Sequence, residues 1–239
     1  MTVVPPPRAA TGVLPIRTLT RVEDDEQLSA LLWRAGSGWR MISSAVLGGG
    51  IGERSWVLNA QVSHGYSRTD PDSHLASLAQ DAGARGPGVG LMTAADVLRY
   101  GRGYDDGVEA VVTAGLGVHG WAAAPAPGTL SPPAPGTINI VVAVPTALTD
   151  AALVNAVTTA TEAKVQALLD SGYDCSGTPT DAVCVAARIP RPGEESQSFA
   201  GPRSLWGARL ARAVHSAVCA AVEPVRGGSL TSARTPAGS

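Results

Sequence analysis

Lys164 is the only lysine of the chain, since all the other residues counted among its 18 basic ones are arginines. It falls in the segment 150–170, whose apolar residues recur at helical spacing. The predicted apolar face consists of Leu153, Val154, Val157, Thr161, Val165 and Leu168. Lys164 lies within this face, whereas Glu162 points nearly the opposite way. Either the amine is held inside, where a cation can stabilise a reacting carbonyl or a carboxylate, or it extends from the edge of the face to water.

Small polar residues follow this helix: Ser176, Gly177, Thr178, Pro179, Thr180 and Asp181. Hydroxyls, a glycine and a carboxylate between a helix and a strand can form the wall of a tight pocket. The alternative is an ordinary turn, in which the Thr and Asp side chains satisfy nearby backbone donors.

Amides and hydroxyls also interrupt apolar segments. Asn139 follows Thr137 at the start of a run of Ile and Val, and Asn59 lies in a second such segment. Ser43 and Thr93 occupy similar positions. A polar side chain that is buried must find hydrogen bonds. These residues are therefore either satisfied structural groups or parts of one shared polar site.

Other familiar motifs are missing. The glycines at 48–52 are not followed by the Lys-Ser/Thr of a phosphate-binding loop, and no Gly-x-Ser-x-Gly elbow occurs. His64, Asp70, Asp72 and His74 have no spacing common to zinc or iron sites. We therefore expect no nucleotide site and no metal ligands from the protein.

The elements that must position these residues alternate along the chain. The sequence predicts strands at 39–46, 56–62, 88–93, 109–116, 137–144 and 182–188, and helices at 71–82, 94–100, 150–170 and 202–222. Thr149 and Asp150 suit the start of the long helix, and Gly172 suits its end. The pattern indicates an α/β class, a mixed α+β layered domain with a central, mainly buried sheet flanked by helices.

The chain has 239 residues and a formal net charge of -2, with 44% hydrophobic and 16% charged residues. We expect a single domain over 12–223, with a flexible Pro/Ala loop at 122–135 and disordered ends at 1–11 and 224–239. Clustered cations are absent, which argues against nucleic acid as a partner. No apolar run is long enough to cross a bilayer. Cys175, Cys184 and Cys219 form no C-x-x-C pair, which favours reduced thiols in the cytoplasm. The sequence leaves a homo-oligomer open.

Nine short runs, taken in order, resemble the adenosylcobinamide amidohydrolase family. They occupy residues 42–45, 56–59, 89–94, 112–117, 136–141, 148–155, 161–164, 176–182 and 201–207. Together they span about residues 40 to 215, nearly the whole expected domain. One departure is Pro179, where a small residue such as alanine is expected. Pro179 stiffens the loop but leaves Thr178, Thr180 and Asp181 in place.

The resemblance implies hydrolysis of the amide that joins the aminopropanol arm to the corrin ring of adenosylcobinamide. The products would be adenosylcobyric acid and aminopropanol, in the salvage of cobinamide for coenzyme B12 synthesis. Cobalt would belong to the corrinoid substrate, so no cofactor is implied.

Amide hydrolysis needs a base, an oxyanion donor and an acid for the leaving amine. Among the matched runs we expect Asp181 to be the base, acting on water or on Thr178. Lys164 would stabilise the oxyanion or keep Asp181 ionised, and Glu162 is a second carboxylate candidate. The expected substrate-binding residues are Ser43, Asn59, Thr93, Thr137, Asn139 and Thr180.

Three alternatives stay open. Thr137 follows Gly136 at a strand start, as in self-processing amidohydrolases with an N-terminal threonine, and this version predicts cleavage of the 24.2 kDa chain. A non-catalytic corrinoid-binding protein would need a broad apolar cleft, which Trp56, Trp121 and Trp206 could line. A third alternative is a hydrolase of some other amide.

Overall fold

The computed structural model of the protein describes residues 13–124 and 136–223. The expected disordered ends, and the expected flexible loop apart from its first residues, lie outside this part of the chain. In chain order the described elements are β1 (Ile16–Glu23), β2 (Glu26–Trp33), β3 (Trp39–Ser43), β4 (Gly50–Glu53), β5 (Val57–Gln61), α1 (Pro71–Asp81), β6 (Val89–Thr93), β7 (Tyr100–Asp105), β8 (Val108–Gly115), β9 (Thr137–Ala147), α2 (Asp150–Asp170), β10 (Ala182–Arg188) and α3 (Leu205–Val222).

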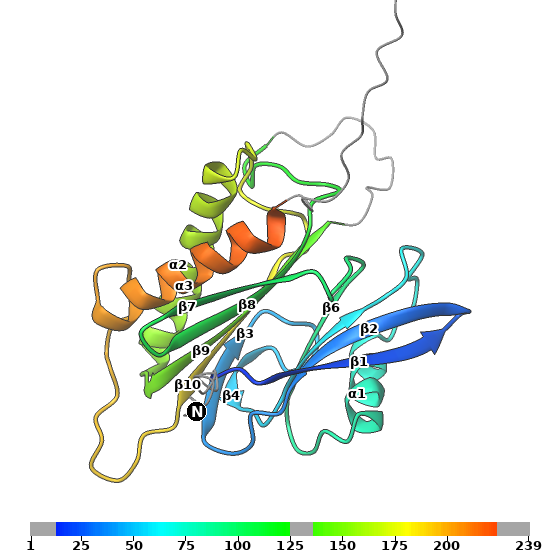
Figure 1. Cartoon of the computed structure of the whole chain (residues 1–239). Helices are drawn as coiled ribbons and strands as arrows, with labels where there is room; N and C mark the ends of the chain where they lie inside the picture. The colour runs from blue at the N-terminus through cyan, green and yellow to red at the C-terminus, as the bar shows by residue number, and fades with distance from the viewer. Residues whose placement is uncertain (1–12, 125–135, 224–239) are drawn as a thin grey trace, which may run out of the picture.

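The strands form two sheets that pack face to face. One has the order β1-β2-β5-β6 and the other the order β4-β3-β10-β9-β8-β7. Helices α2 and α3 cover the outer face of the larger sheet, and α1 lies against the outer face of the smaller one (Figure 1). The layered α/β class predicted from the sequence is confirmed. The expectation of one central sheet is wrong, because strand periodicity shows which face is buried but not which strands pair.

Each interface between layers has its own apolar core. Ile138, Ile140 and Val142 of β9 face α2 and α3, while Val141 and Ala143 of the same strand face the smaller sheet. A strand buried on both faces reads as a continuous apolar run. The polar side chains of Thr137 and Asn139 at the start of β9 are therefore enclosed by protein on both sides.

Helix α2 begins and ends as the sequence predicts. The Thr149 side chain accepts a hydrogen bond from the Ala152 N–H at 3.2 Å, and Asp150 lies in the first turn. The predicted apolar face is wrong in part, because Val154 and Thr161 are exposed. The buried face consists largely of alanines, at positions 152, 156, 160, 163 and 167. Small side chains let α2 lie close to β10 and α3, and Lys164 belongs to this buried face.

The helix predicted at 94–100 does not form. Residues 94–99 make turns, and the edge strand β7 follows directly. A Cβ atom on Gly101 or Gly103 would overlap backbone carbonyls of α3, so these glycines let the helix lie directly on β7. Strands β1 and β2 were not predicted, and β4 forms between two of the predicted strands, in the glycine-containing stretch at 48–52. None of the helices within the described ranges has the length and apolarity needed to span a membrane.

Candidate active site

A cavity of about 470 Å³ opens between the two sheets, and we call it the inter-sheet cavity. It lies where β5 and β6 end and β9 and β10 begin. Its walls come from both sheets and from the segments that follow β3 and β5. The lining residues are Ser44, Ala45, Val46, Val62, Ser63, His64, Tyr66, Leu91, Met92, Thr93, Ala94, Thr137, Asn139, Thr180, Asp181 and Ala182.

A second cavity, of about 710 Å³, lies beside α2, and we call it the α2 cavity. Its lining residues are Val118, His119, Gly120, Trp121, Ala122, Ala124, Thr161, Lys164, Val165, Ser176, Gly177, Thr178, Pro179 and Asp181. Asp181 therefore lines both cavities. The backbone N–H of Gly120 donates to the Gly177 carbonyl at 3.0 Å. This hydrogen bond holds the segment that carries Trp121 beside the turn at 176–181.

Asp181 and Lys164 form an ion pair at the boundary between the cavities. The Lys164 Nζ lies 2.5 Å from the Asp181 Oδ2, and the two side chains are only 9% and 13% exposed. The Asp181 Oδ1 accepts the Ile138 N–H at 2.9 Å and also the Thr178 hydroxyl. The Thr178 N–H lies 3.2 Å from Oδ2. Both carboxylate oxygens are thus already occupied by donors.

Gly177 is required beside this ion pair. A Cβ atom at position 177 would overlap the Asp181 Oδ2 and the Lys164 Nζ. Glycine is the residue that allows a backbone to approach another group so closely. The chain thus keeps the turn at 176–181 pressed against the pair.

Hydroxyl groups surround the carbonyl oxygen of Gly136. The Thr178 Oγ1 lies 2.8 Å from this oxygen, and the Thr180 Oγ1 lies 2.9 Å from it. The Thr180 Oγ1 also lies 2.5 Å from the Thr137 Oγ1. Thr137, Thr178 and Thr180, which the sequence placed in one site, are therefore brought together around the Gly136–Thr137 peptide.

Asn139 joins the two sheets through its amide. The Asn139 Nδ2 donates to the Asn59 Oδ1 at 2.9 Å and to the Met92 carbonyl at 3.0 Å. The Asn59 Nδ2 donates in turn to the Thr113 hydroxyl at 2.9 Å. The Asn139 Oδ1 is buried and has no hydrogen-bond partner among the residues that the structure describes. A buried acceptor without a partner is unusual, and Asn139 is one of the residues that line the inter-sheet cavity.

A string of polar side chains reaches the inter-sheet cavity from the outside of the smaller sheet. The buried His74 of α1 has its Nε2 3.2 Å from the Glu23 Oε1 and its Nδ1 3.0 Å from the Tyr66 hydroxyl. Burial raises the pKa of Tyr66, with smaller and opposing effects of nearby charges. The phenol therefore stays protonated near neutral pH and remains a hydrogen-bond donor at the cavity wall.

The structure does not bring every predicted residue to the cavities. Glu162 is exposed and lines neither cavity, since it projects from the solvent face of α2. Ser43 is buried and donates to the Val183 carbonyl at 3.0 Å, while its neighbour Ser44 lines the inter-sheet cavity. Asn59 contacts the cavity only through Asn139. Thr93 does line the inter-sheet cavity.

The sequence did not indicate Ser63, Tyr66 or the neighbours of Trp121 in the segment 118–122 as lining residues, and it raised His64 only as a metal ligand. Of the three tryptophans expected to line a cleft, Trp121 lines the α2 cavity. Trp206 lies under the Arg209 guanidinium and lines neither of the two cavities.

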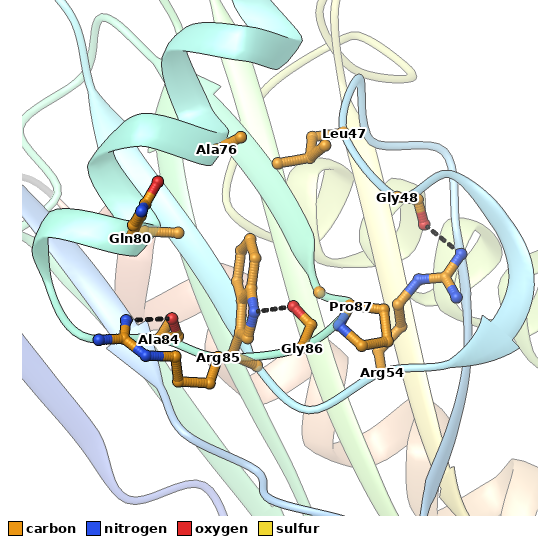
Figure 2. Close-up of a pocket in the computed structure, with 12 residues that line it drawn as sticks. Leu47, Gly48, Arg54, Ala76, Gln80, Ala84, Arg85, Gly86 and Pro87 are labelled. Atoms are coloured by element: carbon orange, nitrogen blue, oxygen red, sulfur yellow. Dashed lines mark hydrogen bonds between the residues drawn. The ribbon is translucent and has the colours of Figure 1, made fainter.

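Trp56 lines a different cavity of about 720 Å³, next to α1 (Figure 2). Its indole N–H donates to the Gly86 carbonyl at 3.0 Å. Arg54 and Arg85 are bonded to backbone carbonyls there. The lining contains no carboxylate, hydroxyl or thiol, so this cavity offers neither a nucleophile nor a base.

In the part of the chain that the structure describes, no three His, Cys, Asp or Glu side chains gather as metal ligands. All three cysteines are free. Burial raises the pKa of Cys184 to about 12. The thiol of Cys184 is therefore a core group and not a nucleophile.

Comparison with known proteins agrees with the resemblance in the sequence. The family model described as adenosylcobinamide amidohydrolase matches residues 15–228. A protein of Methanosarcina mazei named adenosylcobinamide amidohydrolase is 32% identical over 186 residues, which cover 75% of this chain and 88% of that protein. Among solved structures, the PH0078 protein from Pyrococcus horikoshii OT3 matches with a TM-score of 0.45 and 12% identity, covering 86% of this chain and 83% of that one. The chain belongs to the adenosylcobinamide amidohydrolase family.

Proposed function

We propose that this protein hydrolyses the amide between the aminopropanol arm and the corrin ring of adenosylcobinamide, with the reacting amide beside Asp181. Membership of an amidohydrolase family makes the chain a hydrolase of amide bonds. The observation that carries the location is that Asp181, paired with Lys164, lines both cavities. The products are adenosylcobyric acid and aminopropanol, as needed for cobinamide salvage.

The two cavities suit the two parts of this substrate. Aminopropanol is small and polar, and the inter-sheet cavity offers it the polar side chains of Thr93, Thr137, Asn139 and Thr180. The corrin ring is broad and largely apolar. The larger α2 cavity has the partly exposed side chain of Trp121 at its wall. We therefore place the arm between the sheets and the ring against Trp121.

The contacts of Asp181 support a role different from that of a base. A general base needs a free lone pair directed at the proton it removes. Both oxygens of Asp181 already accept hydrogen bonds, from Ile138, Thr178 and Lys164. We propose that Asp181 fixes Thr178 and Lys164 in place, and that Lys164 supplies positive charge for the oxyanion of the reacting amide.

The test is to incubate the purified protein with adenosylcobinamide and a chelator, and to follow the corrinoid and free aminopropanol by mass spectrometry. We expect stoichiometric release of adenosylcobyric acid and aminopropanol, because the cobalt enters with the substrate. Asp181→Asn and Lys164→Met should each lower kcat by about 10²-fold or more. Asp170→Asn is the matched control, since its exposed carboxylate lies at the end of α2, 2.8 Å from the His215 Nε2 of α3, and lines neither of the two cavities.

Corrinoid binding without release of aminopropanol would sink the proposal and leave a binding protein. Release of an amine from other amides only would assign a different substrate. The free thiols fit a reducing compartment, so a cytoplasmic location belongs to the same proposal.

A further inference from the structure

The peptide bond between Gly136 and Thr137 has an unusual environment for a strand start. Its carbonyl oxygen lies within hydrogen-bond distance of two side-chain hydroxyls, those of Thr178 at 2.8 Å and Thr180 at 2.9 Å. The Thr178 hydroxyl has a single proton, which the Asp181 carboxylate accepts, so the hydroxyl that donates to the Gly136 oxygen is that of Thr180. A hydroxyl donor aimed at a carbonyl oxygen stabilises an oxyanion during attack on that carbonyl. The chain thus surrounds one of its own peptide bonds with the groups that amide cleavage needs.

The side chain that follows this peptide bond in the chain, that of Thr137, carries a hydroxyl. Thr137 is buried but lines the inter-sheet cavity, and its Oγ1 lies 2.5 Å from the Thr180 Oγ1. Because Thr180 donates to the Gly136 oxygen, the Thr137 hydroxyl must be the donor to Thr180. The hydrogen bonds therefore run in one direction, from the Thr137 hydroxyl through Thr180 to the carbonyl oxygen of Gly136.

Gly136 itself fits such a step. A Cβ atom at position 136 would overlap the carbonyl of Val118, so a larger residue would displace the peptide from the two hydroxyls. Asp181 fixes the chain on the C-terminal side of the Gly136–Thr137 peptide, because its Oδ1 accepts the Ile138 N–H at 2.9 Å and the Thr178 hydroxyl. The peptide is fixed from both of its ends.

We propose that the protein cleaves its own Gly136–Thr137 peptide bond, and that the freed Thr137 is the nucleophile of the amide hydrolysis. The second part rests on the function proposed above, whereas the first part does not.

The chemistry balances with water as the only co-reactant. The Thr137 oxygen adds to the Gly136 carbonyl carbon, its proton passes to Thr180, and the Thr180 proton passes to the carbonyl oxygen. The C–N bond then breaks as that proton moves to nitrogen, which leaves an ester between Gly136 and the Thr137 oxygen. Water hydrolyses the ester to a Gly136 carboxylate and a free Thr137 hydroxyl. The new α-amine of Thr137 can then act as the base for its own hydroxyl.

Cleavage would leave the fold in one piece. Strand β9 pairs with β8 on one side and β10 on the other. The fragments 1–136 and 137–239 should therefore stay associated under native conditions and separate only on denaturation.

The experiment follows the purified full chain over time by denaturing mass spectrometry and N-terminal sequencing. We expect two fragments, one of which begins at Thr137. Thr137→Val keeps the shape of the side chain without its hydroxyl, and should give an uncleaved chain with kcat lowered by about 10³-fold or more. Thr137→Ser should still cleave. Thr180→Val should slow cleavage by about 10²-fold, because it removes an oxyanion donor.

Thr158→Ala is the control, since Thr158 is exposed on α2 and should cleave like the natural chain. Circular dichroism and thermal unfolding identify any variant that fails to fold. If Thr137→Val does not fold, Thr137→Ser still tests the inference, because a folded Thr137→Ser protein that stays uncleaved would contradict it. An intact chain overturns the inference, and if that chain hydrolyses adenosylcobinamide, the proposed function stands. Cleaved protein that leaves adenosylcobinamide unchanged would instead support self-cleavage and overturn the proposed function.

Discussion

The ammonium of Lys164 lies 2.5 Å from the carboxylate of Asp181, although 17 positions separate the two residues in the chain. The pair is almost fully enclosed and forms the boundary between the two cavities. Removal of one partner leaves an uncompensated charge in this enclosed place, which is more costly than removal of both.

The first prediction concerns this pair. Asp181→Asn and Lys164→Met should each lower the free energy of unfolding by about 3 kcal/mol, because each leaves the other group unpaired. The double variant should lose less than the sum of the two. Urea denaturation gives the free energy of unfolding of the natural chain, the two single variants and the double variant, which together form a double-mutant cycle. Strictly additive losses would mean that the two groups do not interact in solution.

The second prediction concerns Gly177. Gly177→Ala should lower kcat, since the added methyl group would overlap the Asp181–Lys164 pair and separate its partners. Gly65→Ala is the matched control, because a Cβ atom there meets no atom within 4 Å. Steady-state kinetics and thermal unfolding of both variants make the comparison. Equal activities would show that the close approach at position 177 has no catalytic consequence.

The third prediction concerns the Asn139 Oδ1, which finds no hydrogen-bond partner within residues 13–124 and 136–223. If it accepts the N–H of the substrate's reacting amide, Asn139→Ala should lower kcat/KM by about 10- to 100-fold, the cost of one lost hydrogen bond. An N-methylated substrate has no such N–H, so the variant should not lower its kcat/KM further. An equal loss on both substrates would indicate that Asn139 acts only through its bonds to Asn59 and Met92.

The fourth prediction concerns Cys184. Burial raises the pKa of Cys184 to about 12, whereas an unfolded thiol titrates near about 8.5. Between these values the unfolded chain loses a proton that the folded chain keeps, so stability should fall as pH rises. Cys184→Ala should remove up to about 1.4 kcal/mol of this loss per pH unit. Denaturation at several alkaline pH values gives the free energy of unfolding of the natural chain and of Cys184→Ala as a function of pH. The same slope for both proteins would contradict the prediction.

Sequence patterns predicted what depends on local spacing. The bounds of α2 follow from helical periodicity and from the Thr149 cap. Periodicity also placed Lys164 on the apolar face, although it left open whether the amine is buried or extends to water. The run at 176–181 indicated a polar site because its residue types are those of a pocket wall. These features need no knowledge of which segments lie opposite each other.

The sequence could not predict what depends on distant partners. Strand β1 is largely exposed and polar, so it lacks the apolar alternation by which strands are found. Strand β7 contains glycines that only the close approach of α3 explains. The Tyr66–His74 contact depends on the fold of the segment between β5 and α1. Glu162 was kept as a candidate because of its residue type, while its position on α2 turns it to solvent.

Asp181 lines both cavities, so the binding of a ligand in one cavity can affect the binding of a ligand in the other. A ligand in the α2 cavity that attracts or displaces Lys164 changes the charge that the inter-sheet cavity presents. Linkage then requires that a ligand between the sheets alters affinity for the first ligand by the same factor. With the corrin ring beside α2 and the amine between the sheets, as proposed above, the affinities of the protein for the two products are coupled, and each should change the equilibrium affinity for the other.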